Sequence, residues 1–138
     1  MRIRYTAALM GYFQQFWKTT GVEPRDLIEE DRRLLFVVDA PDVSRALGRG
    51  GLHIQKLSTQ LDRTIKVIGF HPGIKEFIAD LFQPIKPKQI DVEKEQVVVT
   101  ANSSEDRGVL IGRNAQNIKN ATAIVQRYFP TIKQIRVI

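Results

Sequence analysis

Two similar stretches decide the fold: residues 47–54, with the sequence LGRGGLHI, and residues 111–118, with the sequence IGRNAQNI. Their first glycines, Gly48 and Gly112, lie 64 residues apart in a chain of 138 residues. Self-similarity at a fixed period of this size is typical of a duplicated structural unit. We therefore expect two copies of one fold, each with a short loop at the same place.

The residues around the first stretch predict a mixed α/β unit. Aromatic and aliphatic residues recur at helical spacing from Tyr5 to Phe16, and β-branched residues are dense in residues 64–68. Pro41 suits the first turn of a short helix. The predicted elements are a helix over residues 5–20, strands over 26–30 and 34–38, helices over 41–47 and 54–61, and a strand over 64–68.

The second half repeats this order. Ser103 and Asp106, three residues apart, form a variant capping box that predicts the start of a helix before Gly112. The predicted elements are a helix over residues 74–81, strands over 89–92 and 96–101, a short helix before Gly112, a helix over 118–128 and a strand over 132–138. Each unit is therefore expected to be a three-stranded sheet packed against helices.

The connection between the units is short. We place the first unit at residues 1–70 and the second at residues 71–138, with residues 69–73, GFHPG, between their last and first elements. Five residues with a proline cannot form a long flexible tether. We therefore expect the units to keep a nearly fixed angle.

The composition excludes several classes of protein. The 43% hydrophobic and 26% charged residues suit a globular domain, and the start of the chain does not resemble a signal peptide. There is no cysteine, and the two histidines are too few for a metal site, so we expect neither disulfides nor a metal cofactor. No dinucleotide fingerprint or phosphate-binding P-loop is present. We expect a cytoplasmic protein, outside the membrane, that is not an enzyme and has no cofactor.

The net charge of +6 is unevenly distributed. Residues 43–75 carry a net charge of +5, and residues 107–138 carry +6 with no acid at all, whereas residues 23–42 and 76–106 each carry −4. One interpretation of this distribution is a scattered basic surface without a specific ligand, which is common in small proteins. The repeated order of charges favours two cationic strips, each suited to a polyanion.

The glycine-rich loop suits a phosphate ligand. Gly48, Gly50 and Gly51 lack the β-carbons that would hold a ligand at a distance, and Arg49 adds a mobile cation. The loop's N–H groups and the N-terminus of the next helix offer partial positive charge to an anion. A turn without any ligand is the alternative. The recurrence of the loop, each time with arginine in second place, favours a function.

These stretches resemble the KH-domain signature, Ile-Gly-x-x-Gly-x-x-Ile. A unit that begins with a helix and ends with a strand is similar to the prokaryotic, type II, KH topology. Two such units in one chain resemble the archaeal NusA family of transcription factors, as do residues 17–21 (WKTTG), 33–38 (RLLFVV) and 107–114 (RGVLIGRN). The resemblance implies binding of nascent single-stranded RNA during transcription elongation or termination. We further expect RNA polymerase as a partner, and a monomer.

The resemblance also implies which residues contact RNA. KH modules clamp about four nucleotides, with phosphates at the glycine loop and bases along an apolar groove. In the first unit the implied RNA-binding residues are Arg45, Gly48, Arg49, Gly50, Gly51, His53, Ile54 and Lys56. In the second unit they are Gly112, Arg113, Asn114, Ala115, Ile118 and Lys119.

Some features leave alternatives open. Ala115 stands where the signature has glycine, and alanine restricts positive φ, so the first loop is expected to bind more tightly than the second. The aromatic residues of the first helix, Tyr5, Tyr12, Phe13, Phe16 and Trp17, are expected in the core, with a base-stacking platform as the alternative. The rival functions are a ribosome-associated or ribosome-assembly KH protein, an adaptor for RNA polymerase and a nucleotide-using enzyme, and the absence of nucleotide-binding motifs disfavours the last.

Overall fold

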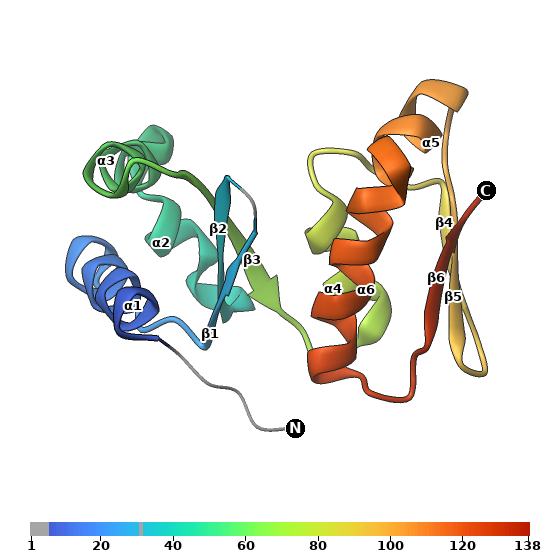
Figure 1. Ribbon diagram of the computed structural model, residues 1–138, viewed down its shortest axis with the longest axis horizontal. Coiled ribbons are helices and arrows are strands. Elements are labelled where there is room, and N and C mark those ends of the chain that lie inside the picture. Colours follow the sequence, from blue (N-terminus) through green and yellow to red (C-terminus); the bar gives the residue numbers. More distant parts are fainter. Residues whose placement is uncertain (1–5, 31) are drawn as a thin grey trace. The chain divides into compact units, whose positions relative to one another are not determined.

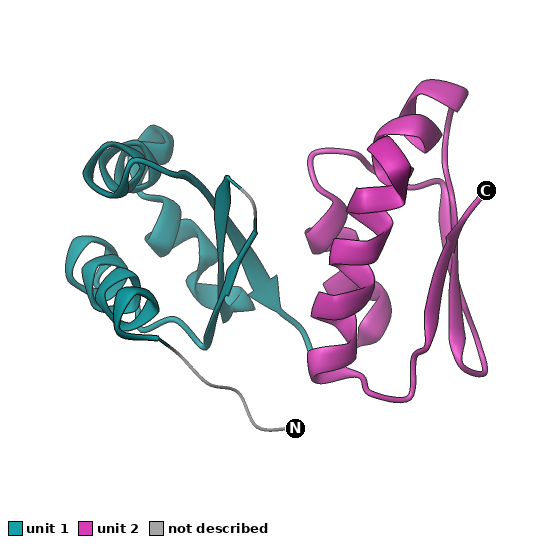
Figure 2. Cartoon of the chain, in the orientation of Figure 1, with its two compact units in different colours: residues 1–71 teal, residues 72–138 magenta. Residues whose placement is uncertain are grey.

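A computed structural model describes residues 6–30 and 32–138 of the chain. The chain divides into two compact units, Met1–His71 and Pro72–Ile138 (Figure 2). Both units have the predicted order of elements, and both contain a three-stranded sheet with helices on one face (Figure 1). The predicted fold class is therefore confirmed.

Unit 1 begins with a long helix and ends with a strand. Its elements, where η marks a short 3₁₀ helix, are α1 (Ala7–Thr20), β1 (Asp26–Glu29), β2 (Arg33–Asp39), η1 (Ala40–Asp42), α2 (Val43–Leu47), η2 (Arg49–Gly51), α3 (Leu52–Leu61) and β3 (Thr64–Phe70). The sheet order is β1-β2-β3, with β2 antiparallel to β1 and parallel to β3. The parallel pair requires a crossover, which α2 and α3 supply.

Unit 2 repeats this arrangement. Its elements are α4 (Ile74–Phe82), β4 (Gln89–Glu93), β5 (Gln96–Thr100), α5 (Ser104–Ile111), η3 (Arg113–Ala115), α6 (Gln116–Tyr128) and β6 (Gln134–Val137). The sheet order is β4-β5-β6, with β5 antiparallel to β4 and parallel to β6. In both units the last strand lies at an edge of the sheet.

Local signals in the sequence fix several of the helix ends. The hydroxyl of Thr6 accepts a hydrogen bond from the Leu9 N–H at the start of α1, and the Ser103 hydroxyl accepts one from the Asp106 N–H at the start of α5. Gly21 ends α1 with φ of 74°, a conformation that glycine adopts without steric cost. The capping function predicted for Ser103 is therefore confirmed.

The structure corrects two details of the predicted elements. Gly69 and Phe70, expected between the units, belong to β3, so three residues separate β3 from α4. Pro41 is the second residue of η1, and the α-helical turn of α2 begins only at Val43. Tyr5 and Asp31, which the predicted first helix and first turn include, lie outside the described residues.

The core of unit 1 lies between its sheet and its helices. Phe16 of α1 stacks on Phe36 of β2 with ring centroids 4.2 Å apart, and both side chains are fully buried. Leu34 and Val38 of β2 join the same cluster, and Leu57 of α3 packs against it. Alternate residues of β2 therefore face the helices, as the two-residue period of a strand requires.

The aromatic residues of α1 divide between core and surface. Phe16 is buried, and Tyr12 and Phe13 are partly buried against the core, as predicted. Trp17 departs from this prediction, because 47% of it is exposed. Trp17 follows Phe16 directly and so lies about 100° further around the helix, away from the sheet.

Unit 2 has an equivalent core. Phe77 of α4 is fully buried and contacts the rings of Tyr128 and Phe129 at centroid distances of 5.4 and 5.7 Å. Val97 and Val99 of β5 are also fully buried. Within residues 6–30 and 32–138, no helix combines the length and the apolar character that crossing a membrane requires.

Candidate nucleic-acid interface

The first loop, residues 48–51, connects α2 to α3. Gly48 has φ of 76° and ψ of 171°, and Gly50 and Gly51 both lie in the left-handed region, with φ of 62° and 73°. The Gly51 N–H donates a hydrogen bond of 3.1 Å to the Gly48 carbonyl oxygen, which closes a tight turn. Three positive φ angles within four residues explain why glycine is needed here.

The second loop, residues 112–115, has the same backbone shape without the same residues. Gly112 has φ of 77° and ψ of 171°, and the Ala115 N–H donates to the Gly112 carbonyl oxygen at 3.1 Å. Asn114 and Ala115 adopt φ of 55° and 59°. Asparagine tolerates the left-handed region, whereas alanine is strained there, and such strain persists where the surroundings impose it. The second unit therefore keeps the shape of the loop at an energetic cost.

Both loops present the groups that an anion needs. Arg49, Gly50, Arg113 and Asn114 are all exposed. The amides at positions 49–50 and 113–114 begin the 3₁₀ turns, and the first N–H groups of a helical turn have no partner within it. Added β-carbons at Gly50 and Gly51 would meet no atom within 4 Å, so the first loop borders open space. The predicted loop residues therefore lie together in each unit.

The remaining predicted residues of unit 1 surround the first loop. Arg45 is exposed, and its guanidinium lies 3.6 Å from the carboxylate of Asp42. Lys56 is exposed on α3, and Ile54 is half-buried, because part of its side chain packs against the core. His53 is half-buried, and its Nδ1 lies 3.1 Å from the Arg45 carbonyl oxygen. The structure therefore gives His53 a contact with the protein backbone that the sequence did not predict.

In unit 2 the predicted residues lead into a groove between α6 and β6. A pocket of about 340 Å³ begins at Ile118 and Lys119, three residues after the second loop. Its further lining comes from Thr122, Ala123 and Gln126 of α6 and from Lys133, Gln134 and Ile135 beside and on β6. The pocket thus combines an apolar floor with two lysines and two amide side chains.

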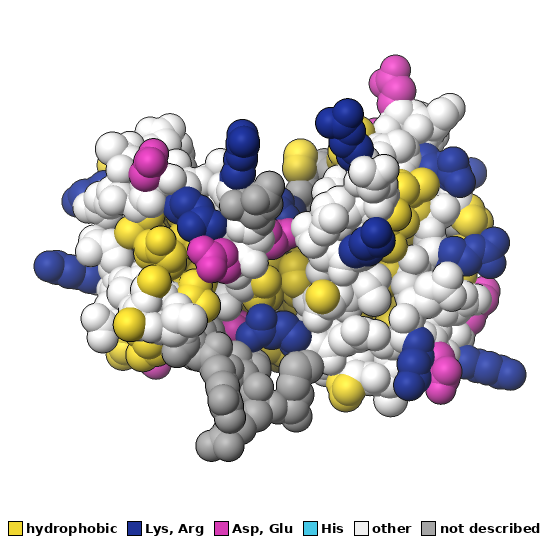
Figure 3. Space-filling model, viewed as in Figure 1, with side chains coloured by type: hydrophobic (Ala, Val, Ile, Leu, Met, Phe, Trp, Pro, Cys, Tyr) yellow, Lys and Arg dark blue, Asp and Glu magenta, His cyan; other side chains and the backbone are white. Residues whose placement is uncertain are grey.

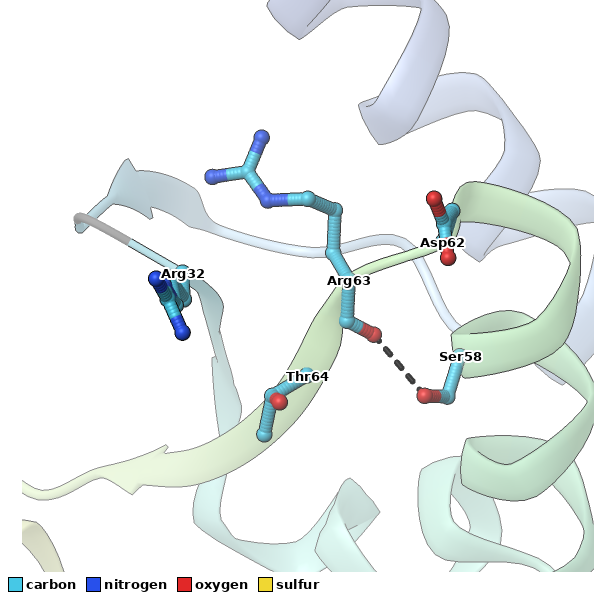
Figure 4. Close-up of a pocket in the computed structure, with 5 residues that line it drawn as sticks. All are labelled: Arg32, Ser58, Asp62, Arg63 and Thr64. Atoms are coloured by element: carbon cyan, nitrogen blue, oxygen red, sulfur yellow. Dashed lines mark hydrogen bonds between the residues drawn. The ribbon is translucent and has the colours of Figure 1, made fainter.

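Unit 1 has a pocket at an equivalent place. It measures about 540 Å³ and is lined by Arg32, Ser58, Asp62, Arg63 and Thr64 (Figure 4). Ser58 and Asp62 lie 64 residues before Thr122 and Gln126, the offset that relates the two loops. Both units therefore have a hollow between the helix that follows the loop and the start of the last strand.

The two pockets differ in their charges. Arg63 forms an ion pair with Glu29 at 2.9 Å, and this hydrogen bond raises the pKa of Arg63. Its guanidinium also donates to the Glu30 carbonyl oxygen at 3.1 Å. The charge of Arg63 is therefore already engaged with protein atoms, and Arg32 is the exposed cation that lines the pocket of unit 1, whereas two exposed lysines, Lys119 and Lys133, line the pocket of unit 2.

Basic side chains are spread over the second unit. Lys and Arg side chains, in dark blue, are scattered over the face of this unit drawn in Figure 3, among mostly uncharged atoms and some Asp and Glu side chains in magenta. This agrees with the charge of +6 over residues 107–138. The described residues contain no group of three His, Cys, Asp or Glu that could hold a metal ion.

Asn117, which lies beside the second loop, is not among the site residues that the sequence predicts. The Asn117 side chain donates a hydrogen bond of 2.7 Å to the Val109 carbonyl oxygen. Asn117 occupies the position of His53 in the repeat, and Val109 occupies that of Arg45. Aligning the two halves at this offset pairs the positions, but the hydrogen bonds that His53 and Asn117 make depend on the fold.

Comparisons with known proteins agree with this architecture. No family model matches the chain. The probable transcription termination protein NusA of Methanococcus vannielii is 28% identical over 141 residues, which cover 100% of this chain and 81% of that protein. The protein of the same name from Halobacterium salinarum is 28% identical over 131 residues and 94% of each chain. The one from Methanocaldococcus jannaschii is 26% identical over 132 residues, 94% of this chain and 70% of that protein.

A solved structure also has this fold. The crystal structure of APE1850 has a TM-score of 0.77 and 28% sequence identity, and it covers 97% of this chain and 100% of its own. The similarity in sequence and in structure thus extends over both units. Together they fit an archaeal NusA-like protein built from two tandem KH-like domains.

Proposed function

We propose that this protein binds single-stranded RNA at its two loops and the adjoining grooves, and that it acts on nascent transcripts as a NusA-like elongation or termination factor. The observation that carries the proposal is the shared shape of the loops, which the second unit adopts with Asn114 and Ala115 at positive φ. Strain of this kind gathers at functional sites. A loop whose sole role was to connect two helices would have no reason to keep a strained backbone.

The chemistry of the loops suits a phosphodiester backbone. In each loop the amides at the second and third positions belong to the same short turn as one exposed arginine, Arg49 in unit 1 and Arg113 in unit 2. Backbone N–H groups with a nearby guanidinium bind phosphate through charge-assisted hydrogen bonds. We expect Arg45 and Lys56 to add long-range attraction along the path of the strand in unit 1.

The grooves suit unpaired bases. The pocket that begins at Ile118 has an apolar floor, with Gln126 and Gln134 at its far end. Single-stranded RNA exposes its bases for stacking and for hydrogen bonds to their edges, whereas a duplex does not. An RNA strand with its phosphates at the second loop would place its bases over Ile118 and Lys119.

We base the transcriptional role on the relatives, which are named probable transcription termination proteins. RNA polymerase is the protein partner we expect, and the cytoplasm is the expected location. The residues of the loops and of the unit 2 groove that support the proposal are backbone amides, arginines, lysines and amide side chains, which suit binding of a strand. We therefore propose a binding factor without catalytic activity or cofactor.

The test is a filter-binding titration with single-stranded RNA and a competing DNA strand of the same sequence. The variant Gly50→Asp with Gly51→Asp places two negative charges at the expected phosphate position. Open space around both glycines leaves room for the new side chains, and aspartate tolerates the positive φ of these positions better than most residues, although at some cost in stability. Asn114→Asp with Ala115→Asp is the matched variant of the second loop. We expect each folded variant to lose RNA affinity, and the combination to abolish binding. Unchanged affinity in the combined variant, with circular dichroism confirming its fold, would exclude the loops as the RNA site.

A further inference from the structure

One side-chain hydrogen bond spans each loop. Nδ1 of His53 lies 3.1 Å from the Arg45 carbonyl oxygen, and Nδ2 of Asn117 lies 2.7 Å from the Val109 carbonyl oxygen. Each contact joins residues eight positions apart and connects the helix after the loop to the helix before it. The two contacts are equivalent, because 64 residues separate both the donors and the acceptors.

The acceptor in each unit is a carbonyl that the helix leaves without a partner. In a continuing helix, the Arg45 oxygen would accept from the N–H of residue 49, but α2 ends at Leu47 with a last bond from Gly48 to Ser44. The last carbonyl groups of a helix need partners from outside it. The same holds for Val109, because α5 ends with a bond from Gly112 to Gly108. His53 and Asn117 supply the missing donors.

The same side chains occupy the space beside the first glycine of each loop. A β-carbon on Gly48 would lie 2.7 Å from Cγ of His53, and one on Gly112 would lie 2.7 Å from Cγ of Asn117. Real β-carbons do not approach other atoms so closely. Glycine is therefore required at positions 48 and 112 for two reasons. It adopts the positive φ, and it leaves the space that the side chain of His53 or Asn117 occupies.

Histidine and asparagine can both form this hydrogen bond because their donor nitrogens lie at the same distance along the side chain. Nδ1 of histidine and Nδ2 of asparagine are each bonded directly to Cγ. A carbonyl oxygen only accepts hydrogen bonds, so Nδ1 of His53 carries the proton in this contact. Two chemically different side chains thus place one N–H group at the same point of the repeat.

From this equivalence we infer that His53 and Asn117 are positioning residues, which hold the first and second loops in the conformation that receives a phosphate. The inference rests on the proposed function and assigns neither side chain a contact with RNA. Without the bridge, the helices on either side of the loop lose a direct link across it. The loop then spends part of its time in other conformations, and its apparent affinity falls in proportion.

The experiment compares donors with non-donors at both positions in the full chain. His53→Leu and Asn117→Leu fill the space without an N–H group, whereas His53→Asn and Asn117→His keep a donor on Cγ. Amide chemical shifts and ¹⁵N relaxation of residues 49–51 and 113–115 report the conformation of each loop without RNA. Titration with a single-stranded oligoribonucleotide then gives the affinity. Circular dichroism well below the melting temperature confirms that every variant is folded.

We expect each leucine variant to loosen its own loop and to weaken RNA binding by about three- to tenfold, the range that the loss of one neutral hydrogen bond corresponds to. The donor-retaining variants should keep both the loop signals and the affinity of the wild type. Leucine variants with unchanged loops or unchanged affinity would overturn the inference, as would equal losses in the leucine and donor-retaining variants. If the wild type itself bound no RNA, the proposed function would fail, and loosening of the loop in the leucine variants alone would still support the positioning role.

Discussion

Replacing Ala115 with glycine should stabilise the second unit. Ala115 has φ of 59° and ψ of 23° at the N-terminus of α6, and Gly51 holds the equivalent place in unit 1 with φ of 73° and ψ of 19°. A residue with a β-carbon is strained in this region, whereas glycine is not. Ala115→Gly removes that strain without changing the path of the backbone. Glycine is also preferred over alanine at the residue that caps a helix start.

The expected gain follows from two opposing effects. The left-handed conformation costs a non-glycine residue roughly 1–2 kcal/mol. Glycine in turn loses more backbone freedom on folding, which costs roughly 0.4–1 kcal/mol. The free energy of unfolding should therefore rise by about 1 kcal/mol, which raises Tm by roughly 4–8 °C for a unit of this size.

Thermal and urea denaturation, followed by circular dichroism, measure this change. Gly51→Ala is the matched control, because a β-carbon at Gly51 meets no atom within 4 Å and adds only the backbone strain. It should lower the stability of unit 1 by about 1 kcal/mol. If Ala115→Gly were neutral or destabilising while Gly51→Ala was destabilising, the argument that the second loop is strained would be refuted.

Other predictions concern binding, coupling and the core. RNA affinity should fall steeply with salt in filter-binding titrations, with a log–log slope of roughly −0.7 for each phosphate neutralised; affinity that does not depend on salt would contradict an electrostatic path for the strand. The variant Gly50→Asp with Gly51→Asp should lose more RNA affinity than Asn114→Asp with Ala115→Asp, since the Ala115 methyl group hinders close approach of a phosphate; equal losses would remove the asymmetry. Because only three residues separate β3 from α4, ¹⁵N relaxation without RNA should give one correlation time for both units, and two independent times would refute this. Phe16→Ala, which removes a fully buried ring, should lower the free energy of unfolding by about 3–5 kcal/mol, whereas Trp17→Ala, at a half-exposed position, should change it by less than about 1 kcal/mol in urea denaturation.

The fold could be predicted from the sequence because local signals and the repeat agreed. The glycine loops marked the duplicated unit, Ser103 marked a helix start, and β-branched residues marked the last strand of unit 1. The ends of elements were less predictable. Pairing with β2 carries β3 through Gly69 to Phe70, although glycine is depleted in strands.

The site was only partly predictable. The loop residues follow from the glycine pattern, but nothing in the local preference of alanine predicts the positive φ of Ala115, which the turn around it imposes. The bridges from His53 and Asn117 depend on the ends of α2 and α5 and were not visible in the spacing of residues. The pockets depend on side chains from a helix and a distant strand, which only the folded chain brings together.

The most direct test of RNA binding at the loops is an NMR titration of the full chain with a single-stranded oligoribonucleotide. We predict that the amide signals of residues 49–51 and 113–115 shift first and furthest, followed by those of residues that line the groove from Ile118 to Ile135. Shifts confined to other surfaces, or none at RNA concentrations that saturate the filter-binding signal, would contradict the proposal that the loops hold the RNA backbone.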